Sequence, residues 1–415
     1  MRLPLFCGIL AIAAVFPANA QELWDLPPIH YSKTLGSDPV ASLAKAVASG
    51  ETSLTKGSES ETLRFILRLL EIPEESQILV YSKTSAQNYF ISPRTPRAIY
   101  FNENAYVGHV LGGGIEIIIH DPVLGVVFYF IEPPQNGKGY QIVRDTGSCL
   151  NCHGTRRTES VPGLTVRSVP TDADGHLLLS LGTMRTDYRS PIEQRWAGYY
   201  VTGSSSLPHL GNRIFSASDH LKAEDTSPPI RSLEDKIDVS RYLRGTSDIV
   251  ALMVLEHQCF IHNLFTNASM EFRRVRWLEE SVSTDPASSR MGRIAEEKAR
   301  VIVDAMLFKH EAAIGEGGVD GDDAFQEAFV SRFPKTKGGE SLADFHLGSR
   351  LFKNRCSYMI HSQAFQALPQ PVRTAVFREL RARLTGGSDC EWIPRSECER
   401  IMEILTETVP GFKDA

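Results

Sequence analysis

The sequence predicts an α+β protein in which a strand-rich amino-terminal half is followed by an all-α carboxy-terminal half. Between residues 77 and 203, short runs rich in Ile, Val, Tyr and Phe are separated by Gly, Pro, Asn and Asp, as is typical of strands and turns. From Asp248 onward, apolar residues recur at helical spacing. The third observation is the pentapeptide Cys149-Leu150-Asn151-Cys152-His153, which lies in a loop between predicted strands.

The length and composition predict two globular domains, because the chain has 415 residues, of which 42% are hydrophobic and 23% charged. We expect an α+β domain over residues 21–203, a Ser-, Pro- and charge-rich connector over 204–246, and a helical domain over 247–415. The formal net charge is −6 and there is no basic stripe, which argues against nucleic-acid binding.

Residues 1–20 have the three parts of a secretory signal peptide. Arg2 supplies the positive start, Leu3–Phe16 the apolar core, and Ala18-Asn19-Ala20 the cleavage site before Gln21. The apolar core is too short to span a bilayer comfortably, and we expect no membrane span in the mature chain. The sequence therefore predicts an exported protein, and a bacterial periplasm is the simplest location.

The elements follow from local patterns in chain order. Thr62–Leu70 predicts a helix that Pro73 ends. The expected strands are ILVYSK, AIYF, AYVGHV, IEIIIH, LGVVFYFI and YQIV, followed by a hairpin in which LTVRSVP and HLLLSLG flank residues 172–175. Asp248–Phe265 is apolar almost all round and predicts a buried helix. Later helices are expected in RIAEEKARVIVDAMLF, AFQEAFVSRF, LADFHLGSRLF, PVRTAVFRELRARL and ERIMEILTET.

The pentapeptide has the pattern of a covalent haem c attachment site. Two thiols three residues apart can add to the two vinyl groups of one haem, and the following histidine then reaches the iron. Such attachment takes place outside the cytoplasm, in agreement with the signal peptide. The alternative interpretation is a CxxC redox motif or zinc half-site with an incidental histidine. We expect one haem c, attached to Cys149 and Cys152, with His153 as the proximal iron ligand.

The sixth iron position decides the chemistry, because a strong second ligand favours electron transfer and an open position admits small molecules. Met253 and His257 share one face of the predicted Asp248–Phe265 helix, and His262 lies about 140° from His257 around its axis. Alternatively, these groups only hydrogen-bond to one another and to the facing domain. Met184 is the methionine preferred for its proximity to the pentapeptide in the sequence, and the remaining candidates are His109, His120 and His209.

Haem propionates need cations, and several arginines follow the pentapeptide. Arg185, Arg189 and Arg195 interleave with aromatic residues around the stretch TDYRSPIEQRWAGYYVTG, and Arg156 and Arg157 are further candidates. The alternative is a solvated arginine face over an ordinary aromatic core. Among the remaining cysteines, Cys390 and Cys398 are close enough in sequence to form a local disulfide in an oxidising compartment.

Several segments resemble a family of exported bacterial proteins with a single cytochrome c-type CxxCH haem motif. They are YSKTSAQNYFISPRTPRAIYFNENAYVGHV, SCLNCHGT, TDYRSPIEQRWAGYYVTG, DIVALMVLEHQ and RLFKNRCSYMIHSQAFQALP, and they cover nearly the whole mature chain. The resemblance implies a mono-haem c-type protein and no particular reaction. Strands around an attachment loop are also similar to haem-bearing PAS-like sensor folds, whereas small all-α cytochromes c carry CxxCH on a helix.

These observations predict a periplasmic mono-haem c-type cytochrome that transfers electrons to or from a redox partner protein. A second hypothesis is a haem-based sensor or small-ligand-binding module, which the strand-rich setting and the large helical half favour. A third is a haem enzyme such as a peroxidase, although two-haem peroxidases need a second CxxCH and this chain has one.

Overall fold

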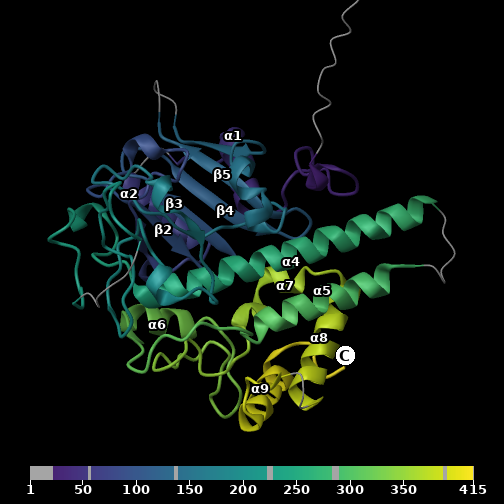
Figure 1. Ribbon diagram of the computed structural model, residues 1–415. Helices are drawn as coiled ribbons and strands as arrows, with labels where there is room; N and C mark the ends of the chain where they lie inside the picture. The colour runs from purple at the N-terminus through teal and green to yellow at the C-terminus, as the bar shows by residue number, and fades with distance from the viewer. Residues whose placement is uncertain are drawn as a thin grey trace, which may run out of the picture.

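A computed structural model describes residues 22–54, 58–134, 139–221, 228–282, 289–386 and 390–414. The predicted signal peptide, residues 1–20, lies outside the described residues. The chain folds as an α+β protein, in which a six-stranded antiparallel sheet is followed by helices (Figure 1). This confirms the α+β class. The carboxy-terminal half is not all-α as predicted, because it contains the short strand Val319–Asp320, and the assignment of the sheet region as a haem c domain stays a prediction.

The strands of the main sheet follow one another in chain order, so that each pairs with its sequence neighbours. The register of the two central strands pairs Ile117 with Tyr129 and Ile118 with Phe128. All six predicted runs contribute a strand: β1 Ile78–Val80, β2 Arg97–Phe101, β3 Ala105–His109, β4 Ile115–Asp121, β5 Gly125–Glu132 and β6 Gln141–Asp145. Successive side chains point to opposite faces of such a sheet, so each face has its own covering layer.

Two amino-terminal helices are tied to one face of the sheet. The Tyr129 hydroxyl donates to the Asp38 carboxylate over 2.7 Å, and His109 Nε2 lies 2.7 Å from Glu59 Oε1. Asp38 and Glu59 stand at the amino-terminal ends of α1 Pro39–Ala48 and α2 Glu59–Leu69. The sequence analysis predicts α2 and misses α1, although Asp38 as N-cap and Pro39 at the first position are helix-start signals.

The opposite face is crossed by α4, Ile249–Val282, which runs the length of the molecule (Figure 1). Every residue from Ile249 to Thr266 is buried, as predicted, and the helix continues well beyond the predicted end at Phe265. Asp248 is the N-cap, since its carboxylate accepts from the Ala251 amide over 2.8 Å. Within the described part of the chain, α4 alone is long and apolar enough to cross a membrane, and 94% of its most apolar stretch is buried inside this protein.

The rest of the helical half packs around α4 and includes one short strand. Strand β10 pairs with β9, so the segment 204–246 is joined to the helical half by a two-stranded ladder. The elements are α5 Met291–Met306, α6 Asp323–Val330, α7 Gln363–Gln366, α8 Gln370–Gly386, α9 Arg395–Thr408, β9 Ser204–Ser205 and β10 Val319–Asp320.

Two predicted elements differ from the structure. The predicted hairpin keeps its turn, with Gly175 at φ +84°, but only an isolated bridge between Thr171 and Leu177 flanks it. Leu179–Leu181, within the predicted second strand, is a 3-10 helix. The two-residue strand β7 Arg167–Ser168 pairs instead with β8 Met184–Arg185, which lies beyond the predicted strand. The predicted helix LADFHLGSRLF is absent, and Phe345 and Phe352 instead form an isolated bridge with stacked rings, their centroids 5.4 Å apart. Aromatic packing in the core overrides the local helical spacing here.

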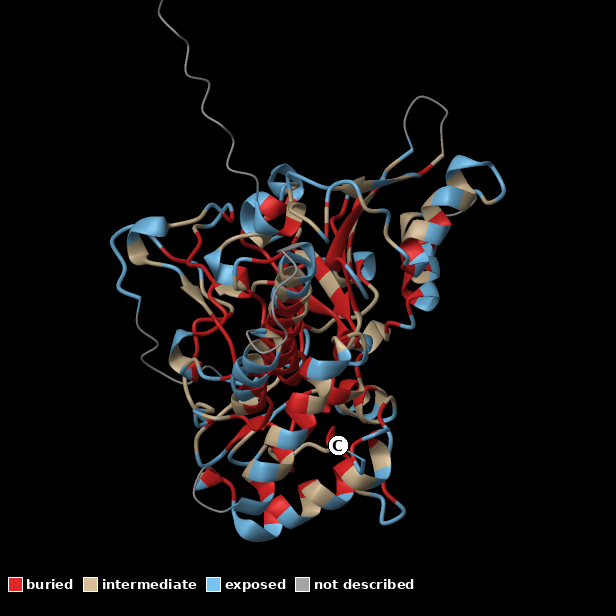
Figure 2. Ribbon diagram, turned by 90° about the vertical axis from the view of Figure 1, so that its right-hand side faces the viewer, coloured by how far each residue is buried: buried red, intermediate tan, exposed pale blue. Residues whose placement is uncertain are grey.

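Buried side chains of both halves form one continuous cluster that extends from Trp24 to Phe412. Figure 2 shows these buried residues through the sheet and along the middle of the molecule, with exposed residues on the outer helix faces. The helical half therefore packs directly on the sheet and shares its core. Cys390 and Cys398, the candidate disulfide, are buried free thiols in this structure.

Lowering the pH below 6.5 is expected to destabilise the fold through two histidines of α4. Burial lowers the pKa of His257 and of His262 to about 3, from 6.5 in an exposed chain. Both rings stay neutral in the fold, whereas the unfolded chain takes up their protons between pH 6.5 and 3. Each of the two histidines should therefore lower the unfolding free energy by about 1.4 kcal/mol for every pH unit that the pH falls in this window. Above pH 6.5 neither histidine should affect the pH dependence.

The measurement is urea unfolding from pH 7.5 to 4.5. In the variant His257→Asn, the unfolding free energy should fall less steeply with decreasing pH. The slope should be smaller by the contribution of one proton, about 1.4 kcal/mol per pH unit. The variant His220→Asn, at an exposed position, is the control for the loss of one histidine. Equal slopes for His257→Asn and the wild type would contradict the assignment.

Candidate functional site

The pentapeptide begins where the last strand of the main sheet ends. Asp145 closes β6, and its carboxylate accepts from the Gly147 and Cys149 amides, both over 3.0 Å. These bonds turn the chain into α3, Leu150–His153, a single helical turn with Cys149 as its N-cap residue. The sequence analysis expects a loop here. The structure has a short helix between strands β6 and β7, because the Asp145 side chain satisfies amides at its start.

The three predicted haem residues lie on one side of this turn. Cys149, Cys152 and His153 are spaced i, i+3 and i+4, the spacing that aligns side chains on one helix face. Cys149 and His153 are half-buried, Cys152 is exposed, and both thiols are free. The His153 ring packs against Phe128 of β5, with centroids 5.3 Å apart. The turn thus carries one exposed thiol, one half-buried thiol and one imidazole at the sheet.

The orientation of the His153 ring follows from its one hydrogen bond. Nδ1 lies 2.9 Å from the Gly163 carbonyl oxygen, which can only accept, so Nδ1 carries the proton. The lone pair therefore sits on Nε2. Burial lowers the pKa of His153, which keeps the ring neutral as metal coordination requires. In iron-ligating histidines the N–H of the second ring nitrogen generally donates a hydrogen bond to a carbonyl or carboxylate oxygen in this way.

The electrostatics of Cys149 disfavour the redox interpretation of the motif. Burial, and then the Asp145 carboxylate, raise the pKa of the Cys149 thiol to about 12. A CxxC redox centre needs a thiolate with a lowered pKa. A structural zinc site needs four ligands, and the one cluster of potential ligands among the described residues has three members away from the motif: the half-buried Asp172 with the exposed Asp174 and His176. The three residues of the motif fit covalent haem attachment better than either alternative.

The sheet face beside the motif carries one ion pair, between Arg97 and Glu116, surrounded by apolar side chains. The Arg97 guanidinium lies 2.9 Å from Glu116, and both charges act on His153. Burial raises the pKa of Glu116, but Arg97 and the hydrogen bonds from Gln87 and Ser85 outweigh it and hold that pKa below its ordinary value. Around this ion pair are the half-buried apolar side chains of the same sheet face, Ile99, Ile118 and Phe130.

The other side of the α3 turn faces a cavity of about 390 Å³. The residues that line it include Leu150, Asn151 and Gly154 of the turn, with Trp24 and Tyr31 of the amino-terminal segment. None of the three haem residues lines this cavity. The aromatic side chains of the amino-terminal segment thus back the turn while its cysteine and histidine face remains separate.

The candidate sixth ligands from α4 are occupied by other partners. His257 Nε2 lies 2.7 Å from the Ser357 hydroxyl, and the ring stacks on Phe308 with centroids 4.2 Å apart. His262 Nδ1 lies 2.7 Å from the Tyr106 hydroxyl. Met253 is buried on the same helix. In the described part of the chain, no hydrogen bond or ring contact joins these side chains to His153.

The remaining candidates lie elsewhere. His109 is paired with Glu59, His120 stacks on His262 with centroids 6.1 Å apart, and His209 packs edge-on against Trp196. Met184 is half-buried on β8, opposite Ser168 of β7. It is the candidate on the strand pair that carries Arg167, a residue within electrostatic reach of Cys152.

The three predicted propionate arginines are all paired with carboxylates of the protein. Arg185 lies 3.0 Å from Glu159, and Arg189 makes two hydrogen bonds to Asp187, of 2.9 and 2.7 Å. Arg195 is fully buried against Glu256, 2.7 Å away. These pairs take up the charges that a propionate would need, and they fix the segment 185–195 to α4 and to its own turn.

The sequence analysis misses a better-placed cation, Arg167 of β7. Its guanidinium is half-buried and donates to the Thr183 hydroxyl over 2.9 Å, and no carboxylate among the described residues pairs with it. Burial, and then the nearby Arg157, lower the pKa of Arg167. It lies close to Cys152, so it can meet an anionic group beside the attachment turn. Its place in the predicted strand LTVRSVP, 14 residues past His153, was a usable signal.

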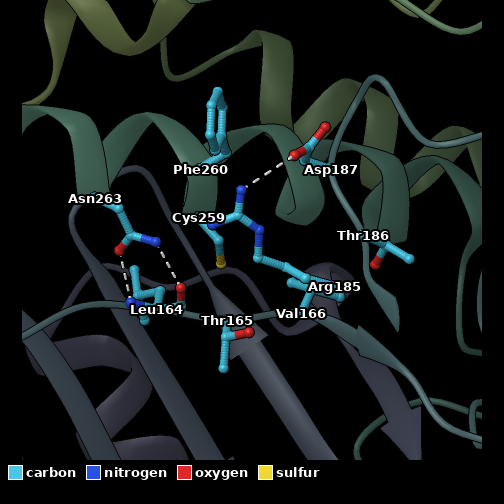
Figure 3. Close-up of a pocket in the computed structure, with 9 residues that line it drawn as sticks. All are labelled: Leu164, Thr165, Val166, Arg185, Thr186, Asp187, Cys259, Phe260 and Asn263. Atoms are coloured by element: carbon cyan, nitrogen blue, oxygen red, sulfur yellow. Dashed lines mark hydrogen bonds and ion pairs between the residues drawn. The ribbon is translucent and has the colours of Figure 1, made fainter. Parts of the chain in front are cut away.

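A second missed residue is Asn263, which reaches the motif from α4. Figure 3 shows its side-chain amide meeting the backbone of Leu164, next to Gly163. The small cavity beside it is lined by α4 and by segments 164–166 and 185–187, and its volume is about 10 Å³. That is close to the minimum for one water molecule. Tight packing here joins the helical half to the segment that follows the CxxCH motif.

Comparisons with known proteins leave the chain without an assigned relative. No family model, no curated protein and no solved structure matches it.

Proposed function

We propose that this chain is an exported mono-haem c-type cytochrome that transfers electrons to or from a redox partner protein. Its haem is attached at Cys149 and Cys152 and its iron is ligated by Nε2 of His153. The observation that carries the proposal is the His153 ring. Its Nδ1–H is held by the Gly163 carbonyl, which leaves the Nε2 lone pair for iron on the same side as two free thiols.

The surroundings support haem as the group. The motif stands beside half-buried apolar side chains of the sheet, and Arg167 is a cation close to Cys152 that can pair with a propionate. Covalently bound haem supplies one-electron chemistry at its iron. The residues of this chain would hold the haem through Cys149, Cys152 and His153 and would keep the proximal imidazole neutral. The predicted signal peptide supports a periplasmic location, where such attachment takes place.

A second candidate function is binding or sensing of a small gaseous ligand. It is favoured by the finding that His257 and His262 have other partners, at Ser357 and Tyr106, which argues against these two strong sixth ligands. The likeness of a strand-flanked attachment segment to haem-bearing PAS-like sensors points the same way. Both functions need the same haem, and they differ in the sixth iron position.

Spectroscopy of the purified, reduced protein separates the two functions. For an electron carrier we expect a six-coordinate, low-spin haem spectrum that carbon monoxide does not change. Rapid carbon monoxide binding would contradict that role and support the second. Replacing Met184, Met253, His257 and His262 one at a time, each by alanine, would then identify any sixth ligand by loss of the low-spin spectrum.

A further inference from the structure

We infer that Asn263, on α4 in the helical half, is a positioning residue for the haem iron. Its side chain holds the backbone segment whose carbonyl orients the proximal histidine. The inference rests on the proposed haem at Cys149, Cys152 and His153. If the inference holds, the helical half helps to orient the His153 imidazole, through contacts that lead from Asn263 on α4 to Leu164, Gly163 and His153.

The first step is a two-point pairing between His153 and Gly163. The Gly163 amide donates to the His153 carbonyl over 2.8 Å, and the His153 ring donates from Nδ1 to the Gly163 carbonyl over 2.9 Å. The Thr158 hydroxyl lies inside the intervening loop and bonds the Val161 carbonyl over 2.8 Å. The loop between His153 and Gly163 is thus closed on itself, and its end sets the ring direction.

The second step is a two-point pairing between Asn263 and Leu164, the residue after Gly163. Asn263 Oδ1 accepts from the Leu164 amide and Asn263 Nδ2 donates to the Leu164 carbonyl, each over 2.7 Å (Figure 3). Asn263 is only 2% exposed, so an amide without these partners would be costly there. The Asn263 side chain thus forms the same two hydrogen bonds with Leu164 that a neighbouring backbone residue would form in a β-sheet, and these bonds hold the segment against α4.

The third step is close packing, which leaves the segment little freedom to move. A Cβ atom at Gly163 would collide with the Asn263 side-chain oxygen and lie 2.9 Å from Thr158 Cβ. Glycine is therefore required for the approach of the segment to α4. A displacement of Leu164 has to move Gly163, and with it the acceptor of the His153 proton.

The consequence concerns the electronic character of the ligand. A firm Nδ1–H···O=C bond makes the imidazole more basic, and a more basic ligand stabilises oxidised iron relative to reduced iron. Loosening the Gly163 carbonyl should therefore raise the reduction potential. Asn263 touches neither the iron nor His153, so its effect must pass through Leu164 and Gly163.

The experiment compares two variants of the haem-loaded full-length protein, Asn263→Leu and Asn267→Leu. Leucine is close to asparagine in size but cannot form the hydrogen bonds. Asn267 is the matched control, because it lies one turn further along α4 and donates to the Glu159 carbonyl over 3.1 Å, in the same loop but outside the His153–Gly163 pairing. Haem content, reduction potential and the haem absorption spectrum are measured for each.

We expect full covalent haem in both variants. For Asn263→Leu the equilibrium between oxidised and reduced iron should shift at least threefold toward reduced iron, about 28 mV at 59 mV per tenfold change for one electron. Asn267→Leu should keep the wild-type potential. Equal potentials in all three proteins would overturn the inference while leaving the proposed function intact. A wild type without covalent haem would overturn the proposed function, and the inference with it.

A measurement on the unmodified protein covers the case in which Asn263→Leu does not fold. In the reduced haem-loaded wild type, the Leu164 amide proton and the His153 Nδ1 proton should both exchange slowly with solvent, as seen by NMR. Fast exchange of the Leu164 amide would show that Asn263 does not hold the segment, and would overturn the inference.

Discussion

Replacing Cys149 and Cys152 together by alanine should abolish all haem that survives denaturing electrophoresis. Each thiol is expected to form one thioether to the haem, and the two lie on the same side of one helical turn as His153. The protein is expressed with a haem c maturation system, and in-gel haem staining and the pyridine haemochrome spectrum measure the attached haem. The single variants should each keep a weakened stain through the remaining thiol.

The control for this experiment is a cysteine pair outside the motif. Cys259 and Cys356 are buried free thiols, and their replacement by alanine should leave the haem stain unchanged. Wild-type staining in the Cys149→Ala/Cys152→Ala protein would refute haem attachment at this site. Absence of stain from the wild type, with the maturation system active, would refute the cofactor itself.

Replacing Glu256 by leucine should cost about 3–5 kcal/mol of unfolding free energy, because it leaves the buried Arg195 without its counter-charge. The two side chains are 0% and 1% exposed and 2.7 Å apart. The measurement is urea unfolding at pH 7. The matched control is the double variant Arg195→Met/Glu256→Leu, which removes both charges and should recover most of the loss.

The ion pair lies between α4 and the segment around Arg195, so the test also reports on that junction. The Arg195 guanidinium additionally donates to the Ser190 carbonyl over 2.8 Å. A loss below about 1 kcal/mol in Glu256→Leu would be the size expected of an exposed pair, and would contradict the burial of this one.

The sheet could be predicted from sequence because its strands carry strong local patterns. In IEIIIH and LGVVFYFI, runs of β-branched and aromatic residues are bounded by glycine and aspartate, and both runs become central strands. The helix LADFHLGSRLF was wrong for the opposite reason. Its apolar spacing is helical, but Phe345 and Phe352 pack into an aromatic cluster of the helical half, and Leu347 adopts a positive φ of 58°. Such packing partners are distant in sequence and leave no local signal.

The motif residues could be recognised in the sequence because their spacing is itself the signal, and haem attachment to them stays a prediction. The partners of Arg185, Arg189 and Arg195 could not be predicted, because these arginines were proposed to bind propionates from their interleaving with aromatic residues in the sequence. Their carboxylate partners include Glu256, which is 61 residues from Arg195 along the chain. Similarly, Asn263 looked like one polar residue in an apolar helix. Its partner Leu164 lies 99 residues away, and only the fold brings the two together.

The buried polar side chains of α4 have one more consequence, which concerns how many ways this helix can dock on the sheet. A uniformly apolar helix can slide or rotate against an apolar face at small cost. Gln258 instead donates to the Asn102 carbonyl and the Tyr106 hydroxyl, over 2.7 and 2.8 Å, and accepts from Tyr358 over 3.0 Å. A shift by one helical turn, about 5.4 Å, would leave these groups unpaired. Each would then cost about 1–3 kcal/mol. Apolar burial holds the two layers together, and the polar groups inside the interface select a single alignment.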